Sequence, residues 1–113
     1  MTNLSAQRCQ PCEGGIAPLE PAQAQELLQQ INVEWSLSPG SNEISRNFTF
    51  KNYYQTIAFV NAIAWIANQE NHHPDLEVSY NYCRVRYSTH AINGLSENDF
   101  ICAAKVDGLL SGS

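Results

Sequence analysis

The sequence predicts an α+β domain in which a four-stranded antiparallel sheet carries three helices on one face, in the order α-β-β-α-β-β-α. Two observations lead to this prediction. Short runs of alternating apolar and polar residues occur in two pairs, and the runs of each pair are separated by a short turn. Longer runs with helical spacing stand before, between and after these pairs. Because strands joined by short turns lie antiparallel, each pair is expected to form a hairpin.

The first three elements follow from local signals. A helix is expected over residues 20–31, where Pro21 suits the first helical position. Apolar and polar residues then alternate over 33–37, which predicts a half-buried strand. The Pro-Gly-Ser-Asn turn at 39–42 leads into a second alternating run over 44–50. These residues are therefore expected to form the first hairpin.

The central helix is expected over residues 53–71. Asn52 can cap its start, with Gln55 as the reciprocal partner of a capping box. Two adjacent rows of apolar side chains run along it, and a stripe of that width is typical of a helix lying on a sheet. Pro74 ends the helix, because proline has no N–H and disfavours a helical conformation at the residue before it.

The second half of the chain repeats the hairpin and adds the last helix. Alternation over 76–80 and over 83–87 predicts two further strands. Ser96 and Asp99 have the spacing of a capping box, which predicts a final helix reaching about residue 110. The outer face of such a sheet and its two edges stay uncovered, so a homodimer, or dimers paired as a homotetramer, is expected.

Composition narrows the class of protein. The 113 residues fit a flexible lead-in over 1–18 and one domain over 19–113. With a net charge of -5 and six Lys and Arg in total, the chain has no electrostatic footprint for nucleic acid. No apolar run approaches the roughly 20 residues of a membrane span, and the N-terminus lacks the apolar core of a secretory signal. We therefore expect a cytoplasmic protein without membrane or nucleic-acid partners.

The lead-in contains Cys9 and Cys12 in a C-x-x-C spacing. A thioredoxin-like site would need a strand directly before it, and none is expected there. A zinc site would need two more ligands, and no second C-x-x-C exists. An incidental thiol pair, or one that binds metal weakly, is the third interpretation. In a reducing compartment all four cysteines are expected to be free.

All three histidines of the chain, His72, His73 and His90, lie at the ends of expected elements. Three interpretations remain open for them. A histidine at a helix C-terminus can be purely structural, since the helix dipole favours it there. Three histidines could bind zinc, although adjacent residues after a helix tend to diverge. The third interpretation is acid–base catalysis, because imidazole gains and loses protons near neutral pH and a helix C-terminus would favour a protonated His72 or His73.

Two motifs in this stretch carry a resemblance to a known family. The first is His72-His73-Pro74, and the second is Ser88-Thr89-His90 followed by Gly94-Leu95-Ser96, with Tyr80 and Val85 between the motifs and Asp99 after them. Over residues 20–110 the sequence resembles the pterin-4a-carbinolamine dehydratases, whose fold has the element order predicted above. The C-x-x-C falls outside the resemblance.

The resemblance implies an activity and partners. The reaction would be the dehydration of a 4a-hydroxytetrahydropterin to quinonoid dihydropterin and water, without cofactor, redox centre or Lewis acid. It would recycle tetrahydropterin for an aromatic amino acid hydroxylase such as phenylalanine hydroxylase. Animal members of the family also bind a homeodomain transcription factor, so the alternative implied is a protein-interaction or transcriptional cofactor module.

The resemblance also implies roles for seven residues. His72, His73 and His90 would be the catalytic trio, with His72 and His90 transferring protons and His73 orienting the substrate. Pro74, Ser88 and Thr89 would line the pterin pocket. Asp99 would either close the capping box or supply a charge near His90. If the strand continued, His90 would lie on the same face as Arg84 and Arg86, away from the core. We therefore predict that the chain turns off the sheet by Thr89.

Overall fold

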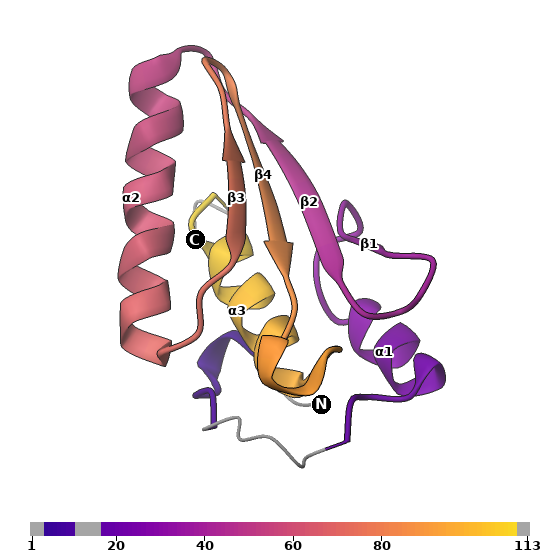
Figure 1. The fold of residues 1–113 in the computed structure, drawn as a ribbon. Coiled ribbons are helices and arrows are strands. Elements are labelled where there is room, and N and C mark those ends of the chain that lie inside the picture. The colour runs from indigo at the N-terminus through magenta and orange to yellow at the C-terminus, as the bar shows by residue number, and fades with distance from the viewer. Residues whose placement is uncertain (1–3, 11–16, 111–113) are drawn as a thin grey trace.

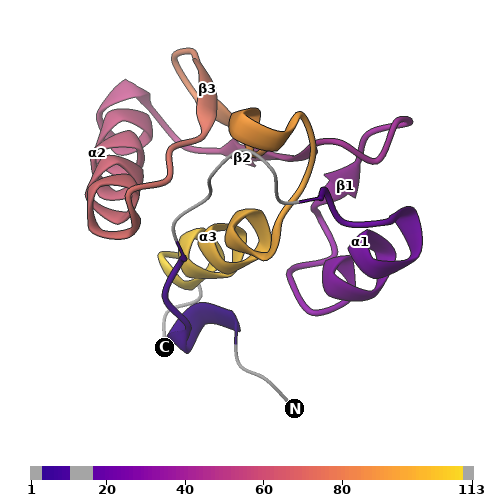
Figure 2. The same cartoon turned by 60° about the horizontal axis from the view of Figure 1, so that its bottom comes forward.

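The computed structural model describes residues 4–10 and 17–110. The elements are the 3₁₀ helix η1 (Leu4–Ala6), α1 (Pro21–Leu28), β1 (Ser36–Leu37), β2 (Ile44–Thr49), α2 (Tyr53–Glu70), β3 (Asp75–Val78), β4 (Tyr82–Tyr87), the 3₁₀ helix η2 (His90–Ile92) and α3 (Glu97–Gly108). The sheet has the order β1-β2-β4-β3, and all neighbours are antiparallel (Figure 1). The helices α1, α2 and α3 lie side by side on one face of the sheet (Figure 2). The predicted fold class and element order are confirmed.

The core lies between the central strands and the helices. On β4 the side chains of Cys83, Val85 and Tyr87 are fully buried, as the alternation predicts. Their partners on the neighbouring strand β2 include Ile44, opposite Tyr87, and Phe48, opposite Cys83. The helix α3 contributes a continuous buried run from Asn98 to Ala103. Tight burial of both layers fixes the register of β4 and therefore the point at which it ends.

The helix α2 buries only one of its two apolar rows. Phe59, Ile63 and Ile66 are buried. The members of the adjacent row are half-buried or exposed, namely Tyr53, Ile57, Val60, Ala64 and Ala67. At its start the Asn52 side chain accepts a hydrogen bond from the Gln55 N–H at 2.9 Å, as predicted. The Gln55 side chain does not reciprocate to Asn52. It accepts instead from the N–H of Lys51, the residue before Asn52, so the predicted capping box is only half formed.

Two predicted strands differ from the structure. Residues 33–37 pair with β2 only through Ser36 and Leu37, and Val33 is 91% exposed. The cause is local, because the Asn32 side chain accepts from the Glu34 N–H and its carbonyl accepts from the Trp35 N–H, which replaces strand pairing by a turn. The strand expected over 76–80 is the edge strand β3, Asp75–Val78, and all four of its residues are exposed. The helix α1 also ends three residues earlier than predicted.

The described part of the lead-in packs on the domain. Leu4 of η1 is 4% exposed and belongs to the core, and Lys105 on α3 donates to the Ser5 carbonyl at 2.8 Å. Residue 12, the second cysteine of the C-x-x-C, lies outside the described residues, and the domain boundary at residue 18 stays a prediction. Within residues 4–10 and 17–110, no helix is both long and apolar enough to cross a bilayer.

Candidate active site

The first histidine corner follows α2. The helix ends at Glu70, and Asn71 adopts the left-handed conformation with a φ of 51°. That turn allows the His72 N–H to donate a hydrogen bond to the Ala67 carbonyl at 3.1 Å. Pro74 then precedes β3, so His72 and His73 occupy the short link between helix and edge strand. The local sequence Asn-His-His-Pro therefore dictates that both imidazoles stand at an element end.

The second corner follows β4. After Tyr87 the chain leaves the sheet, as predicted, and Thr89 pairs only with Gly94 through an isolated bridge. Residues 90–92 form a 3₁₀ turn closed by Asn93 in the left-handed conformation. Gly94 allows this turn to sit against the chain before α1, because a Cβ there would lie 2.7 Å from that of Pro18. The turn carries His90 to the surface, where its side chain is 63% exposed.

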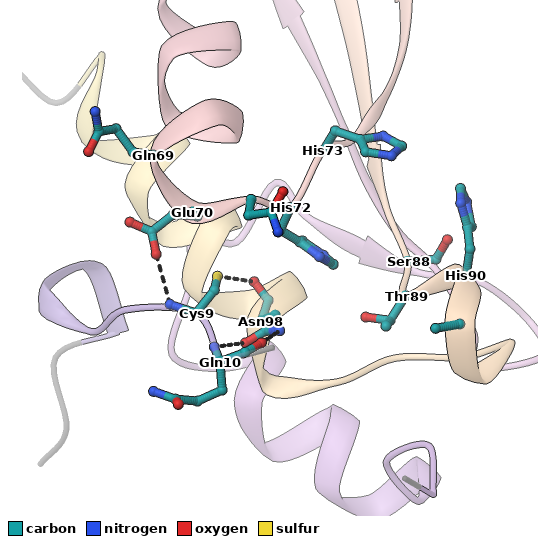
Figure 3. A pocket seen from close by; sticks show the side chains of 12 residues that line it. Cys9, Gln10, Gln69, Glu70, His72, His73, Ser88, Thr89, His90 and Asn98 are labelled. Atoms are coloured by element: carbon teal, nitrogen blue, oxygen red, sulfur yellow. Dashed lines mark hydrogen bonds between the residues drawn. The ribbon is translucent and has the colours of Figure 1, made fainter. Parts of the chain in front are cut away.

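Both corners open on one cavity of about 450 Å³. Its lining includes five of the seven predicted site residues, namely His72, His73, Ser88, Thr89 and His90 (Figure 3). Pro74 and Asp99 do not line it. A volume of this size is in the range of small-molecule sites.

The three imidazoles approach one another from the two corners. The rings of His73 and His90 meet edge to face, with centroids 6.0 Å apart. The His72 ring stacks on the buried Tyr87, 6.0 Å away and within 8° of parallel. Only 11% of the His72 side chain is exposed, whereas 63% of the His90 side chain is open to solvent. The site therefore combines one fixed imidazole with two exposed ones.

Asp99 holds His72 from behind. Its fully buried carboxylate accepts through Oδ1 from His72 Nε2 at 2.7 Å. Through Oδ2 it accepts from the Thr89 hydroxyl at 2.8 Å and from the Ser96 N–H at 3.0 Å. The predicted capping box with Ser96 is present. The other role expected of Asp99, a charge near His90, falls on His72 instead.

The partner of His90 is Asp75, which sequence reasoning missed. Its Oδ2 lies 3.7 Å from His90 Nε2, and both side chains are more than half exposed. Asp75 is the first residue of β3 and follows the His-His-Pro motif directly. That adjacency is the signal that could have indicated it.

Glu70 is a second residue that the sequence did not indicate. Its Oε1 accepts from the Cys9 N–H at 2.7 Å, and its Oε2 lies 3.0 Å from Arg8 Nε and 3.9 Å from Lys105 Nζ. Burial alone would raise the pKa of this carboxyl, but the Cys9 N–H and the two cations together lower it below its ordinary value. Glu70 therefore ties the lead-in to the end of α2, two residues before His72.

Metal binding was the competing interpretation of the histidines. Among residues 4–10 and 17–110, no group of three or more His, Cys, Asp or Glu side chains is arranged to hold a metal ion.

The fold and the cavity are those of an α+β protein with an imidazole-lined pocket at one end of its sheet. Residues 17–109 match the model of the family described as pterin 4 alpha carbinolamine dehydratase. The chain belongs to this family.

Individual relatives agree. A Nitrosomonas eutropha protein, named provisionally as a pterin-4-alpha-carbinolamine dehydratase, is 62% identical over 97% of this chain and 98% of its own length. A Legionella pneumophila protein with the same name is 60% identical over 96% of both chains.

Two solved structures are similar to the fold. A transcriptional coactivator/pterin dehydratase from Brucella melitensis superposes with a TM-score of 0.76 at 29% identity, covering 81% of this chain and 97% of that one. A pterin dehydratase-like protein described as a RuBisCO assembly factor in the alpha-carboxysome has a TM-score of 0.60 at 25% identity, covering 71% and 93%. Family and relatives thus support a pterin dehydratase, and the second structure shows that the fold also occurs in an assembly factor.

Proposed function

We propose that the protein dehydrates a 4a-hydroxytetrahydropterin to quinonoid dihydropterin and water by acid–base catalysis from its histidines. The observation that carries this proposal is the convergence of His72, His73 and His90, from two corners of the fold, on one cavity of about 450 Å³. Family membership supports the pterin as substrate. In the cytoplasm the reaction would recycle tetrahydropterin for an aromatic amino acid hydroxylase such as phenylalanine hydroxylase.

The chemistry needs two proton transfers. The hydroxyl on C4a must gain a proton to leave as water, and the neighbouring N5–H must lose one as its lone pair expels the hydroxyl. Positioned acids and bases each contribute about 10²–10⁴-fold to such a reaction. We assign these transfers to His72 and His90, and assign orientation of the ring to His73, whose imidazole meets that of His90 edge to face.

Asp99 acts through His72 in this proposal. A carboxylate can only accept a hydrogen bond, so the hydrogen between the two residues belongs to His72 Nε2. The nitrogen left to exchange a proton with the substrate is Nδ1. Because the Asp99 side chain is fully buried, we infer that it positions the imidazole and does not touch the pterin.

The polar contacts to the pterin are proposed to come from the two residues that follow β4, Ser88 and Thr89. Ser88 and Thr89 both line the cavity, and the Thr89 hydroxyl donates to Asp99. Thr89 is therefore expected to act mainly by shaping the wall. Pro74 is expected to place His73 through its backbone constraint.

A stopped-flow assay with synthetic 4a-carbinolamine tests the proposal. We expect His90→Ala to slow dehydration by about 10²–10⁴-fold, with an unchanged circular dichroism spectrum. Gln25→Ala, on the exposed side of α1 and outside the cavity, is the matched control and should keep the wild-type rate. Equal rates in all three proteins would rule out His90 as a proton-transfer group.

A protein-interaction module is the second candidate, and one observation favours it. Tyr54 and Trp65 are 82% and 65% exposed on α2, and their spacing of eleven residues places them on one face of the helix. The proposed homodimer or homotetramer could use this face or the open edge of β3. Sedimentation of wild type against Trp65→Ala tests the helix face. If the protein binds a partner but shows no dehydration rate, the interaction module becomes the first candidate and the dehydratase the second.

A further inference from the structure

Two cysteines that the proposed chemistry does not use lie next to each other. Cys9 in the lead-in and Cys102 on α3 are separated by 93 positions, yet their Sγ atoms are 3.5 Å apart. Cys102 is fully buried, and Cys9 is half-buried at the wall of the histidine cavity. Cys9 lies before residue 17, where the family match begins.

The backbone on both sides of Cys9 is fixed by side chains of the domain. The Cys9 N–H donates to Glu70 at 2.7 Å. The next residue, Gln10, exchanges two hydrogen bonds with the Asn98 amide: its N–H donates to Oδ1 at 3.0 Å, and its carbonyl accepts from Nδ2 at 2.6 Å (Figure 3). Arg8 Nη2 donates to the Gln69 carbonyl at 3.1 Å. Hydrogen bonds of three consecutive residues, 8–10, therefore hold the Cys9 sulfur next to Cys102.

We propose that Cys9 and Cys102 are an oxidisable thiol pair whose intramolecular disulfide anchors the lead-in to α3 and fixes one wall of the histidine cavity. A disulfide needs a sulfur separation of about 2.05 Å, so the two atoms must approach by about 1.5 Å. One side-chain rotation or a small shift of the lead-in supplies that movement. The bond would join the lead-in covalently beside Glu70, the last residue of α2.

Hydrogen peroxide is the oxidant proposed, and the step balances. The more accessible Cys9 sulfur attacks one peroxide oxygen, the O–O bond breaks, and Cys9 becomes a sulfenic acid while the other oxygen leaves as water. The Cys102 sulfur then attacks the Cys9 sulfur, the S–O bond breaks, and the departing hydroxide takes the Cys102 proton as the second water. Two thiols lose two electrons and one peroxide gains them.

The environment of Cys102 sets the order of these steps. The hydrogen bond with Cys9 and burial raise the pKa of the Cys102 thiol, so it stays protonated. A protonated buried thiol reacts slowly with peroxide. Cys9 is therefore the sulfur oxidised first, and Cys102 resolves the sulfenic acid because it is already in contact and gives its proton to the departing hydroxide as it attacks.

The experiment treats the reduced full-length chain with hydrogen peroxide, alkylates the remaining thiols and maps the peptides without reduction. We expect a peptide linking Cys9 to Cys102 within one chain, and a thermal midpoint raised by about 10 °C or more, because the bond closes a long loop. Dithiothreitol should reverse both changes. Cys12→Ser should retain the link and Cys9→Ser should lose it. Cys83 is the buried reference thiol, since burial raises its pKa to about 11, and it should stay free.

Other products would overturn the inference. A link from Cys9 to Cys12, a link between two chains, or sulfinic acid at Cys9 with Cys102 still free would each show that the contact does not lead to this bond. A Cys9–Cys102 link without a higher midpoint would overturn the anchoring of the lead-in. None of these readouts depends on dehydratase activity.

Discussion

The two ends of α3 each hold an aspartate, and the two carboxylates have different partners. At the first turn Asp99 accepts from a backbone N–H, a hydroxyl and His72, at 2.7 to 3.0 Å. At the last turn Asp107 accepts from Arg46 Nη1 and Trp35 Nε1, both at 2.7 Å, and from a backbone N–H at 3.0 Å. Each carboxylate thus has three donors, but only Asp107 has a donor that is permanently charged.

The helix dipole explains why the partners differ. A negative charge is stabilised at a helix N-terminus and destabilised at the C-terminus. Asp99 lies at the favourable end, where the helix itself stabilises a negative charge without a permanently charged partner. Asp107 lies at the unfavourable end and has the guanidinium of Arg46, which stacks over Phe48 at 4.2 Å. We therefore propose a chemical role for the first end of α3 and a stabilising role for the last end.

The largest effect is expected at the chemical end. His72→Gln keeps an amide that can donate to Asp99, so the buried carboxylate stays paired, but it removes the group that exchanges protons. We expect kcat to fall by about 10²–10⁴-fold while the thermal midpoint changes little. Stopped-flow dehydration and calorimetry measure the two quantities on the same preparation. A rate within about twofold of wild type would remove the chemical role from this end.

The opposite pattern is expected at the other end. Asp107→Ala leaves the Arg46 guanidinium, 15% exposed, without its carboxylate, and we expect the free energy of unfolding to fall by about 3 kcal/mol. The rate at a temperature where the variant is folded should stay near that of wild type. Urea unfolding measures the loss, and Glu97→Ala, an exposed acid on the same helix, is the control expected to change little. A large loss of kcat in folded Asp107→Ala would break the comparison.

How far the sequence predicts these two ends depends on distance along the chain. The capping box of Ser96 and Asp99 spans three residues, and a local rule indicates it. The bond from Asp99 to His72 spans 27 positions and that from Asp107 to Arg46 spans 61, so no local pattern contains them. The motifs predicted which histidines gather, but not which carboxylate each one meets.

The same limit applies to the fold. Alternation and helical spacing predicted β2, β4 and α3, because the apolar residues of these elements form the core, although they did not indicate that Asn98 and Asp99 of α3 are also buried. They failed at Val33, where the Asn32 side chain replaces strand pairing by a turn. They predicted only a flexible lead-in over 1–18 and did not indicate the contacts of Cys9 with Glu70 and of Gln10 with Asn98.

Asp99→Asn sharpens the comparison with a smaller change. Asparagine can still accept from the Ser96 N–H, but it offers no carboxylate to His72. We expect kcat to fall by about 10²-fold and the free energy of unfolding by about 1–3 kcal/mol, since one buried hydrogen bond is lost or reversed. A purely structural Asp99 would lower stability and leave the pH profile of kcat in place. A changed pH profile in the folded variant is therefore the diagnostic measurement.

A third carboxylate tests the pH dependence. The pKa of Glu70 is lower in the folded protein than its ordinary value of 4.5, so its contribution to stability is complete above that value and is lost as the pH falls through the folded pKa. Glu70→Gln lacks this contribution and should be about 1 kcal/mol less stable at pH 7. The gap between the two unfolding curves should stay constant from pH 8 to about pH 5.5 and close at lower pH. A gap that widens on acidification would contradict the assigned direction.

The smallest effect is expected at Tyr87, the ring that touches both ends. It lies 6.2 Å from the Trp35 ring, which donates to Asp107, and stacks on His72, which donates to Asp99. Its hydroxyl is buried without a hydrogen-bond partner among the described residues, and burial raises its pKa, so it stays a neutral phenol.

Tyr87→Phe keeps the ring contacts and removes an unpaired buried polar atom. We expect the free energy of unfolding to rise by about 1 kcal/mol and kcat to stay within about twofold. A tenfold fall in kcat without loss of stability would place the hydroxyl in the reaction. If the variant instead behaves as expected, Tyr87 is an inert spacer, and the two ends of α3 can be altered independently of each other.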